Sequence, residues 1–197
     1  MYKKYEIEKF LDELSSTKSM PGGGTASALT AANGVALALK VINLSFGKEK
    51  YMAYKELLSE AKEKLETFKN LFLNYMDEDA KNFEAMEEVY KLKKDTAEEK
   101  EKRKKLLEDA CKICCKVPTE IVVNSMKCLK ILKSLEGKSN VSAASDLKVG
   151  EEFLKAAILG AYENVLINLK YIEDESFKKN FIELTEKVLE FKKGENI

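Results

Sequence analysis

The 197-residue sequence contains no histidine and no tryptophan, and it has only two prolines. Without histidine, the Ser-His and Cys-His pairs that activate many catalytic nucleophiles are excluded. Zinc sites that depend on imidazole ligands are excluded as well. Any acid–base chemistry must therefore be carried by Asp, Glu, Lys, Tyr or Cys side chains.

Cysteine is also sparse, with four residues at Cys111, Cys114, Cys115 and Cys128. Cys111 and Cys114 are three residues apart and can share one face of a helix. A structural metal site would need a second pair at suitable spacing, and the other two cysteines do not supply it. We therefore expect buried, reduced thiols and no bound metal.

The chain lacks an excess of charge of either sign, since 34 Lys and Arg residues balance 34 Asp and Glu residues. A formal net charge of 0 argues against nucleic acid as the main partner. The N-terminal residues have neither an apolar signal core nor a small-residue cleavage site, so we expect a cytoplasmic protein. The length fits a single domain over residues 1–197 that buries a core without disulfides.

We find no strand pattern, and apolar residues recur at helical spacing almost throughout. The sequence predicts an all-α bundle of long, kinked helices that dimerises. A kink or short interruption is expected at Pro118, and a capping box at Thr96–Glu99. The first expected helix has an inner face of Ile7, Phe10, Leu11 and Leu14, and the second follows Pro21 and the glycines and runs to about Phe46. A third, bent helix is expected over about Glu49–Lys91, and a fourth from Ala97 to Glu136. Two more are expected, one from about Ser145 and a last one capped by Asp174.

One segment has no charged residue at all, between Lys18 and Lys40. It starts with Pro21 and three glycines and continues as a helix of small residues, which has no polar face to offer water and so belongs inside a structure. The glycines leave amide N–H groups uncovered at the positive end of that helix. We interpret the segment as one wall of an active site, with tight helix packing as the alternative.

Other interpretations of this glycine-rich segment fit less well. No Gly-Lys-Ser/Thr follows the glycines, and no strand precedes them, so the segment is neither a phosphate loop nor a dinucleotide fingerprint. A membrane span is rejected because the helix carries four polar side chains: Thr25, Ser27, Thr30 and Asn33.

Three polar positions interrupt otherwise apolar faces or begin a helix. Asp79 shares a helix face with Met76 and Phe83, where a carboxylate is costly unless it is paired or used. Asn164 and Asn168 stack one turn apart, either as amides that bridge helices or as functional groups. Asp146 follows Ser145 at a helix start, where it is an ordinary cap.

Together, seven blocks of sequence point to one family, over about Phe10 to Phe177. The blocks are Pro21–Ala26 with its helix, Phe46–Lys48, Asp77–Ala80 before Phe83, Thr96–Lys100, Val117–Pro118, Ser145–Leu147 and Gly160–Leu169. In their order and spacing the chain closely resembles the cyclodeaminase domain of formimidoyltransferase-cyclodeaminase and the stand-alone cyclodeaminase/cyclohydrolase proteins.

The resemblance implies an all-helical homodimer in one-carbon metabolism and histidine degradation, with folate bound near the subunit interface. It implies a lyase reaction in which N10 of 5-formimidoyltetrahydrofolate attacks the amidine carbon on N5, closing 5,10-methenyltetrahydrofolate and releasing ammonia. No cofactor is implied beyond tetrahydrofolate as the substrate carrier. A separate formimidoyltransferase would supply the substrate, and neither nucleic acid nor a membrane is implied as a partner.

By the same resemblance, Asp79 is the carboxyl that takes a proton from N10 and then protonates the departing nitrogen. The residues expected to bind substrate are Gly22, Gly23, Gly24 and Thr25 at its polar edge, Lys48 and Lys50 at glutamate carboxylates, and Asn140, Asp146, Asn164 and Asn168 around the pterin or the charged centre. Two alternatives stay open. One is methenyltetrahydrofolate cyclohydrolase, in which water attacks the same carbon, and the other is a non-catalytic dimer that binds folate or a partner.

Overall fold

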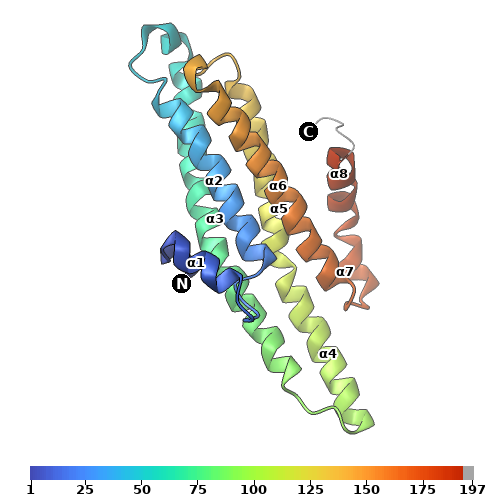
Figure 1. Ribbon diagram of the computed structural model, residues 1–197. Coiled ribbons are helices and arrows are strands. Elements are labelled where there is room, and N and C mark those ends of the chain that lie inside the picture. The colour runs from blue at the N-terminus through green and yellow to red at the C-terminus, as the bar shows by residue number, and fades with distance from the viewer. Residues whose placement is uncertain (193–197) are drawn as a thin grey trace.

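Long helices run side by side in the computed structural model, which describes residues 1–192 (Figure 1). No strand occurs in that range. Helices α2 and α6 pack against each other, α2 also packs on α3, and α5 packs on α6 and α3. The bounds are α1 Ile7–Leu14, α2 Gly23–Asn43, α3 Lys55–Tyr90, α4 Ala97–Cys114, α5 Lys116–Leu135, α6 Ala144–Leu169, α7 Glu175–Lys179 and α8 Ile182–Lys192, with 3₁₀ segments Tyr2–Lys4, Glu49–Tyr54 and Val141–Ala143.

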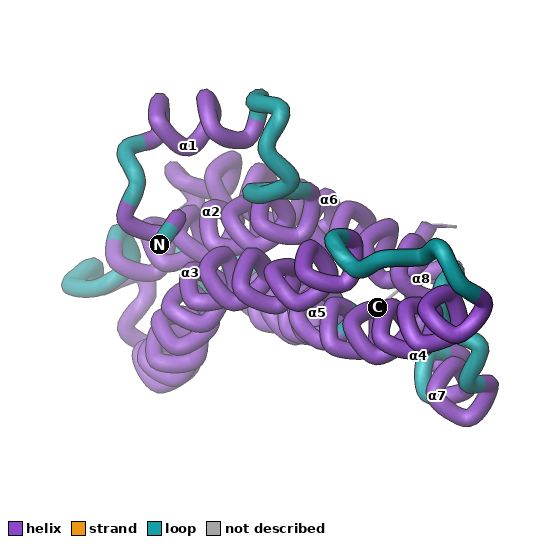
Figure 2. The backbone as a smooth tube through the Cα atoms, turned by 90° about the horizontal axis from the view of Figure 1, so that it is seen from below, coloured by secondary structure: helices purple, strands orange, loops and turns teal. Residues whose placement is uncertain are grey.

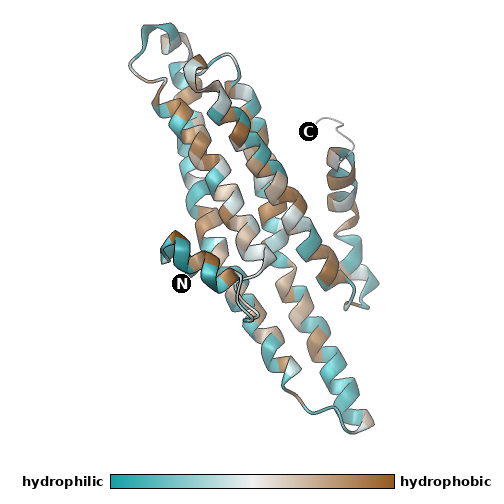
Figure 3. Cartoon of the chain, viewed as in Figure 1, coloured by the Kyte–Doolittle hydropathy of each residue, from teal (hydrophilic) through white to brown (hydrophobic). Residues whose placement is uncertain are grey.

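Helix α2 lies in the core of the bundle, as its lack of charge predicts. Its mean hydropathy and length make it the one helix among the described residues that is long and apolar enough to cross a bilayer. However, most of that stretch is buried inside the protein, and a core helix passes the same test. The apolar character of α2 is visible in the hydropathy colouring of Figure 3.

Small residues let α2 and α6 approach backbone to backbone. A Cβ added to Gly34 would lie 2.7 Å from the carbonyl oxygen of Gly150, and a Cβ on Gly150 would lie 2.8 Å from that of Gly34. Nearer the start of α2, a Cβ on Gly160 would lie 2.7 Å from Ser27 Oγ. The two helices are therefore antiparallel, and their contact places the C-terminal half of α6 beside the first turn of α2.

The predicted boundaries are confirmed in part. The capping box is present, with Thr96 Oγ1 accepting from Glu99 N and the Glu99 side chain accepting from Thr96 N. The interruption expected at Pro118 falls at Cys115, between α4 and α5. Pro118 is thereby the third residue of α5, where its missing N–H would have no intrahelical partner in any case.

Three expectations about elements were wrong. In α1 only Phe10 is buried, whereas Ile7 is 80% and Leu11 53% exposed, because the helix lies on the outer side of α2 (Figure 2). Helix α2 ends at Asn43 rather than near Phe46. The last helix is divided at Asn180 and Phe181 into α7 and α8, although Asp174 does cap α7 by accepting from Phe177 N.

Candidate active site

Asp79 of α3 meets the first turn of α2. Its Oδ2 accepts a 2.8 Å hydrogen bond from Thr25 Oγ1. A Cβ added to Gly24 would lie 2.4 Å from Asp79 Oδ1 and 2.7 Å from its Cγ, closer than real Cβ atoms approach. The carboxyl therefore occupies space that only glycine at position 24 leaves open.

The surroundings of this carboxyl favour its protonated form. Burial raises the pKa of Asp79 above its ordinary value, and the hydroxyl and backbone N–H of Thr25 act in the opposite direction without cancelling the rise. The partial positive charge at the N-terminus of α2 also favours the carboxylate and therefore acts against the rise. A carboxyl with a raised pKa holds a proton more readily than an ordinary aspartate and can accept and return one.

Asp79 lines a cavity of about 220 Å³ that lies where five helices meet. Its walls come from α2, α3, the end of α4, the start of α5, α6, and the segment before α2. In full, the lining residues are Ser19, Met20, Gly22, Gly23, Gly24, Asp79, Phe83, Cys114, Pro118, Asn164, Ile167 and Asn168. Among these lining residues Asp79 is the one carboxyl, and none is a lysine or an arginine.

Asn164 and Asn168, which the family resemblance placed at the substrate, both line this cavity. Asn164 Nδ2 donates to Gly160 O at 2.9 Å, and Asn168 Nδ2 donates to Asn164 O at 2.8 Å. Both bonds stay within α6, so these amide N–H groups do not bridge α6 to another helix. Asn164 nevertheless lies against α2, since a Cβ on Gly23 would come within 3.0 Å of its Nδ2.

Thr25 belongs to the site in a different way from the one expected. Its side chain is fully buried, its hydroxyl bonds to Asp79, and it is not among the residues that line the cavity. The glycines Gly22, Gly23 and Gly24 do line it, in agreement with their expected place.

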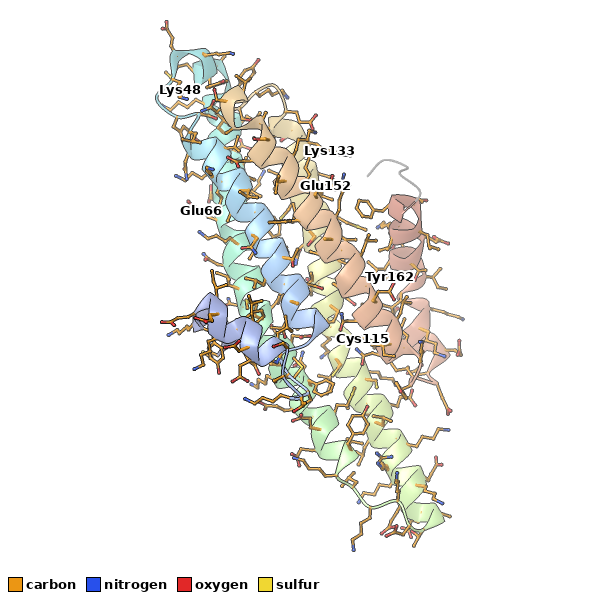
Figure 4. The ribbon with its side chains drawn as sticks, viewed as in Figure 1. Lys48, Glu66, Cys115, Lys133, Glu152 and Tyr162 are labelled. Carbon is orange, nitrogen blue, oxygen red and sulfur yellow. The ribbon has the colours of Figure 1, made fainter. Side chains whose placement is uncertain are left out.

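Four expected substrate-binding residues lie elsewhere in the chain's own fold, at the far end of the bundle. Asp146 pairs with Lys40 at 2.8 Å. Asn140 is buried in a turn, where its N–H donates to Ser45 Oγ and its Nδ2 donates to Leu44 O. Lys48 and Lys50 are not among the residues that line the cavity. In Figure 4, Lys48 lies at one end of the bundle, well away from Cys115. The 21 residues of α2 separate the two ends by about 30 Å.

Several other lining residues could not be placed in the site by sequence reasoning. Cys114 is one of them; its thiol donates to Asn82 O, and burial raises its pKa to about 12, so it stays neutral and a poor nucleophile. All four cysteines are free and buried. Within residues 1–192, no group of three or more acidic or cysteine side chains is arranged to hold a metal ion.

Comparisons with known proteins show the family of this chain. Residues 6–187 match the family model described as formiminotransferase-cyclodeaminase. The chain is 33% identical to the formimidoyltransferase-cyclodeaminase of Gallus gallus over 92% of its own length, which is 34% of that relative. It is 32% identical to the methenyltetrahydrofolate cyclohydrolase of Methylorubrum extorquens over 93% of its own length and 88% of that protein.

A solved structure has the same fold. The formiminotetrahydrofolate cyclodeaminase of Thermotoga maritima superposes with a TM-score of 0.84 at 26% identity, covering 95% of this chain and 90% of that one. The chain thus spans about a third of the length of the avian relative but most of the cyclohydrolase and of the bacterial cyclodeaminase.

Proposed function

The chain belongs to the formiminotransferase-cyclodeaminase family, and from that membership we propose that it converts 5-formimidoyltetrahydrofolate to 5,10-methenyltetrahydrofolate and ammonia. The observation that carries the proposal is Asp79, a carboxyl with a raised pKa in a cavity at the N-terminus of α2. It supplies acid–base catalysis without histidine, which the chain lacks.

The reaction needs one group that first removes and then returns a proton. N10 attacks the carbon of the amidinium on N5, and a C–N10 bond forms. Asp79 takes the proton that N10 loses, then gives a proton to the exocyclic nitrogen, and the bond between that nitrogen and carbon breaks to release ammonia. The N5 electron pair completes the methenyl cation, so the positive charge of the amidinium passes to the product and no proton is gained or lost overall.

The lining of the cavity supports this chemistry. Its volume of about 220 Å³ lies below the roughly 300–1,000 Å³ of pockets that enclose a whole ligand. We therefore place only the reacting end of the folate inside it, with the glutamate portion outside. A carboxyl and two asparagine amides suit a cationic amidinium, whereas a glutamate tail would find no cation among these residues.

Methenyltetrahydrofolate cyclohydrolase is the second candidate. The relative from Methylorubrum extorquens favours it, because that protein matches almost from end to end, whereas the avian enzyme is three times as long. In this reaction Asp79 would take a proton from the attacking water rather than from N10. We prefer the cyclodeaminase because apolar side chains such as Phe83, Pro118 and Ile167 line the cavity and disfavour water.

The two candidates differ in the direction in which the methenyl absorbance changes. Purified protein given 5-formimidoyltetrahydrofolate should produce a rise in that absorbance together with stoichiometric ammonia. Given 5,10-methenyltetrahydrofolate, it should cause no decay beyond the buffer rate. Decay on the second substrate with no rise on the first would establish the cyclohydrolase, and no change on either would overturn both activities.

We also propose that a second copy of the chain covers α2 on the side where α1 lies. Helix α2 carries no charge between Gly23 and Leu39, and it exposes Asn33 and Ala36. On the neighbouring α1, Ile7 and Leu11 leave an apolar stripe in solvent. Large exposed apolar patches mark protein interfaces. Because the family resemblance implies a homodimer, we take a second copy of this chain as the partner that covers this one.

The dimer is tested by placing charges on this face. The parent protein should run in light scattering at twice the 22.3 kDa chain mass, and the Ile7→Lys, Ala36→Lys double variant should fall to the chain mass. Ile182→Lys is the matched control, because Ile182 is also exposed, at 54%, but lies on α8. A parent protein that is monomeric at micromolar concentration would refute the proposed dimer.

A further inference from the structure

Thr25 does not line the cavity and so cannot contact a substrate there, yet its hydroxyl makes a side-chain hydrogen bond to Asp79. The side chain is fully buried, and Oγ1 donates to Asp79 Oδ2 at 2.8 Å. Helix α2 begins with Gly22 as its N-cap, which has no side chain to cap the first turn. The Asp79 carboxyl, reaching across from α3, thus meets the open N-terminus of α2 in place of a local cap.

We propose that Thr25 is a positioning residue that engages Oδ2 of Asp79 and leaves Oδ1 as the oxygen that exchanges protons with the substrate. This inference rests on the proposed function. Among the described residues the side-chain donor to this carboxyl is the Thr25 hydroxyl, which engages Oδ2, so the proton adds at Oδ1. Thr25 Oγ1 still donates to Oδ2 after that proton has been added, since Oδ2 then serves as the carbonyl oxygen.

The contact therefore persists through both halves of the reaction. Asp79 can give up and regain its proton without rotating about its side-chain bonds, because one oxygen stays fixed. Gly24 adds to this restraint, since the carboxyl lies against it: an added Cβ would come to 2.4 Å from Oδ1 and 2.7 Å from Oδ2. A carboxyl held within a narrow range of orientations is the condition for efficient proton transfer inside a small cavity.

Few other groups affect the charge state of Asp79. Besides Asp79, Cys114 at the end of α4 is the one titratable side chain among the residues that line the cavity. Its raised pKa keeps the thiol neutral over the pH range in which the enzyme would be assayed. The cavity residues from α2, α5 and α6 do not titrate, nor do Ser19 and Met20. A change at Thr25 should therefore appear directly in the titration of Asp79.

The test compares Thr25→Val, which removes the hydroxyl, with Thr25→Ser, which keeps it. Loss of the donor destabilises the ionised carboxylate, so the acid limb of kcat against pH should move upward by about one pH unit in Thr25→Val. We expect kcat at neutral pH to fall about tenfold as well, because the carboxyl is no longer held. Thr25→Ser should restore both the limb and the rate.

Other outcomes separate this inference from the proposed function. If Thr25→Val changes only stability and leaves the acid limb in place while Asp79→Asn is inactive, Thr25 is purely structural and the inference falls alone. If Asp79→Asn turns over like the parent, the role of Asp79 falls first. Should valine prevent folding at this buried position, Thr25→Ala removes the same hydroxyl without branched apolar bulk, and the same shift is expected.

Discussion

Asp79→Asn is expected to lower kcat at least about 100-fold while the protein stays folded. Asparagine cannot accept the N10 proton, but it keeps an oxygen that accepts from Thr25 Oγ1. The measurement is methenyl formation at saturating substrate, together with thermal unfolding of both proteins. Asp77→Asn is the matched control: Asp77 lies two residues away, contacts Lys3 outside the cavity, and should leave kcat unchanged.

Asp79→Asn should not lower the stability of the folded protein. Burial raises the pKa of Asp79, so the folded state binds a proton more tightly than the unfolded chain does. The free energy of unfolding therefore falls as the pH rises from the pKa of Asp79 in the unfolded chain to its pKa in the folded protein. Above the folded-state pKa this loss of stability is complete. Since asparagine carries no charge, we expect Asp79→Asn to unfold at an equal or higher temperature than the parent at neutral pH, with the difference vanishing in acid.

A stability gain combined with lost activity is typical of a group retained for chemistry. If instead Asp79→Asn were strongly destabilised at neutral pH and no less stable in acid, the carboxylate would be a structural cap of α2. Full activity in the variant would remove Asp79 from the mechanism altogether.

Gly24→Ala is expected to lower kcat by a similar factor, solely because the added methyl group clashes with the Asp79 carboxyl. The new Cβ would lie 2.4 Å from Asp79 Oδ1, so the carboxyl must leave its position against Thr25. Alanine favours a helix over glycine by roughly 1 kcal/mol, which offsets part of the strain and helps α2 to form. We therefore expect folded protein with kcat reduced at least about 100-fold.

The neighbouring glycines give a graded series of controls. A Cβ on Gly22 meets nothing closer than Met20 Sδ at 3.6 Å, an ordinary contact, so Gly22→Ala should leave Asp79 in place and lose the least activity of the three variants. A Cβ on Gly23 comes to 3.0 Å from Asn164 Nδ2 and should give an intermediate loss. Equal activities for the three variants would contradict the tight placement of Asp79 against position 24.

The central position of α2 and the inward face of Asp79 could be predicted from sequence for simple reasons. The 21 residues from 19 to 39 carry no charge, so the helix that they form has to be covered. Asp79 stands at helical spacing from Met76, which is buried, and Phe83, which is half-buried. Both inferences use only periodicity within one helix. The family resemblance then supplied the reaction.

Contacts between helices could not be predicted in this way. The hydrogen bond from Thr25 to Asp79 joins residues 54 apart, and Cys114 reaches the cavity from α4, so no pattern within one helix marks either of them. For α1, the pattern predicted an inner face that includes Ile7, Phe10 and Leu11, but of these three only Phe10 is buried, because the spacing does not show how much of the face a neighbouring helix covers. Asp146 belongs to a family motif in the expected order along the chain, and Asn140 lies in the loop before it, but α2 separates both from Asp79 in space.

The most direct measurement is the titration of the Asp79 carboxyl carbon by ¹³C NMR, assigned with Asp79→Asn and set beside the pH dependence of kcat/KM. We predict a pKa above the ordinary 3.8 of aspartate, and an acid limb of kcat/KM with the same midpoint. A carboxyl that titrates at or below 3.8, or a rate that does not follow its titration, would contradict the assignment of the proton transfers to Asp79.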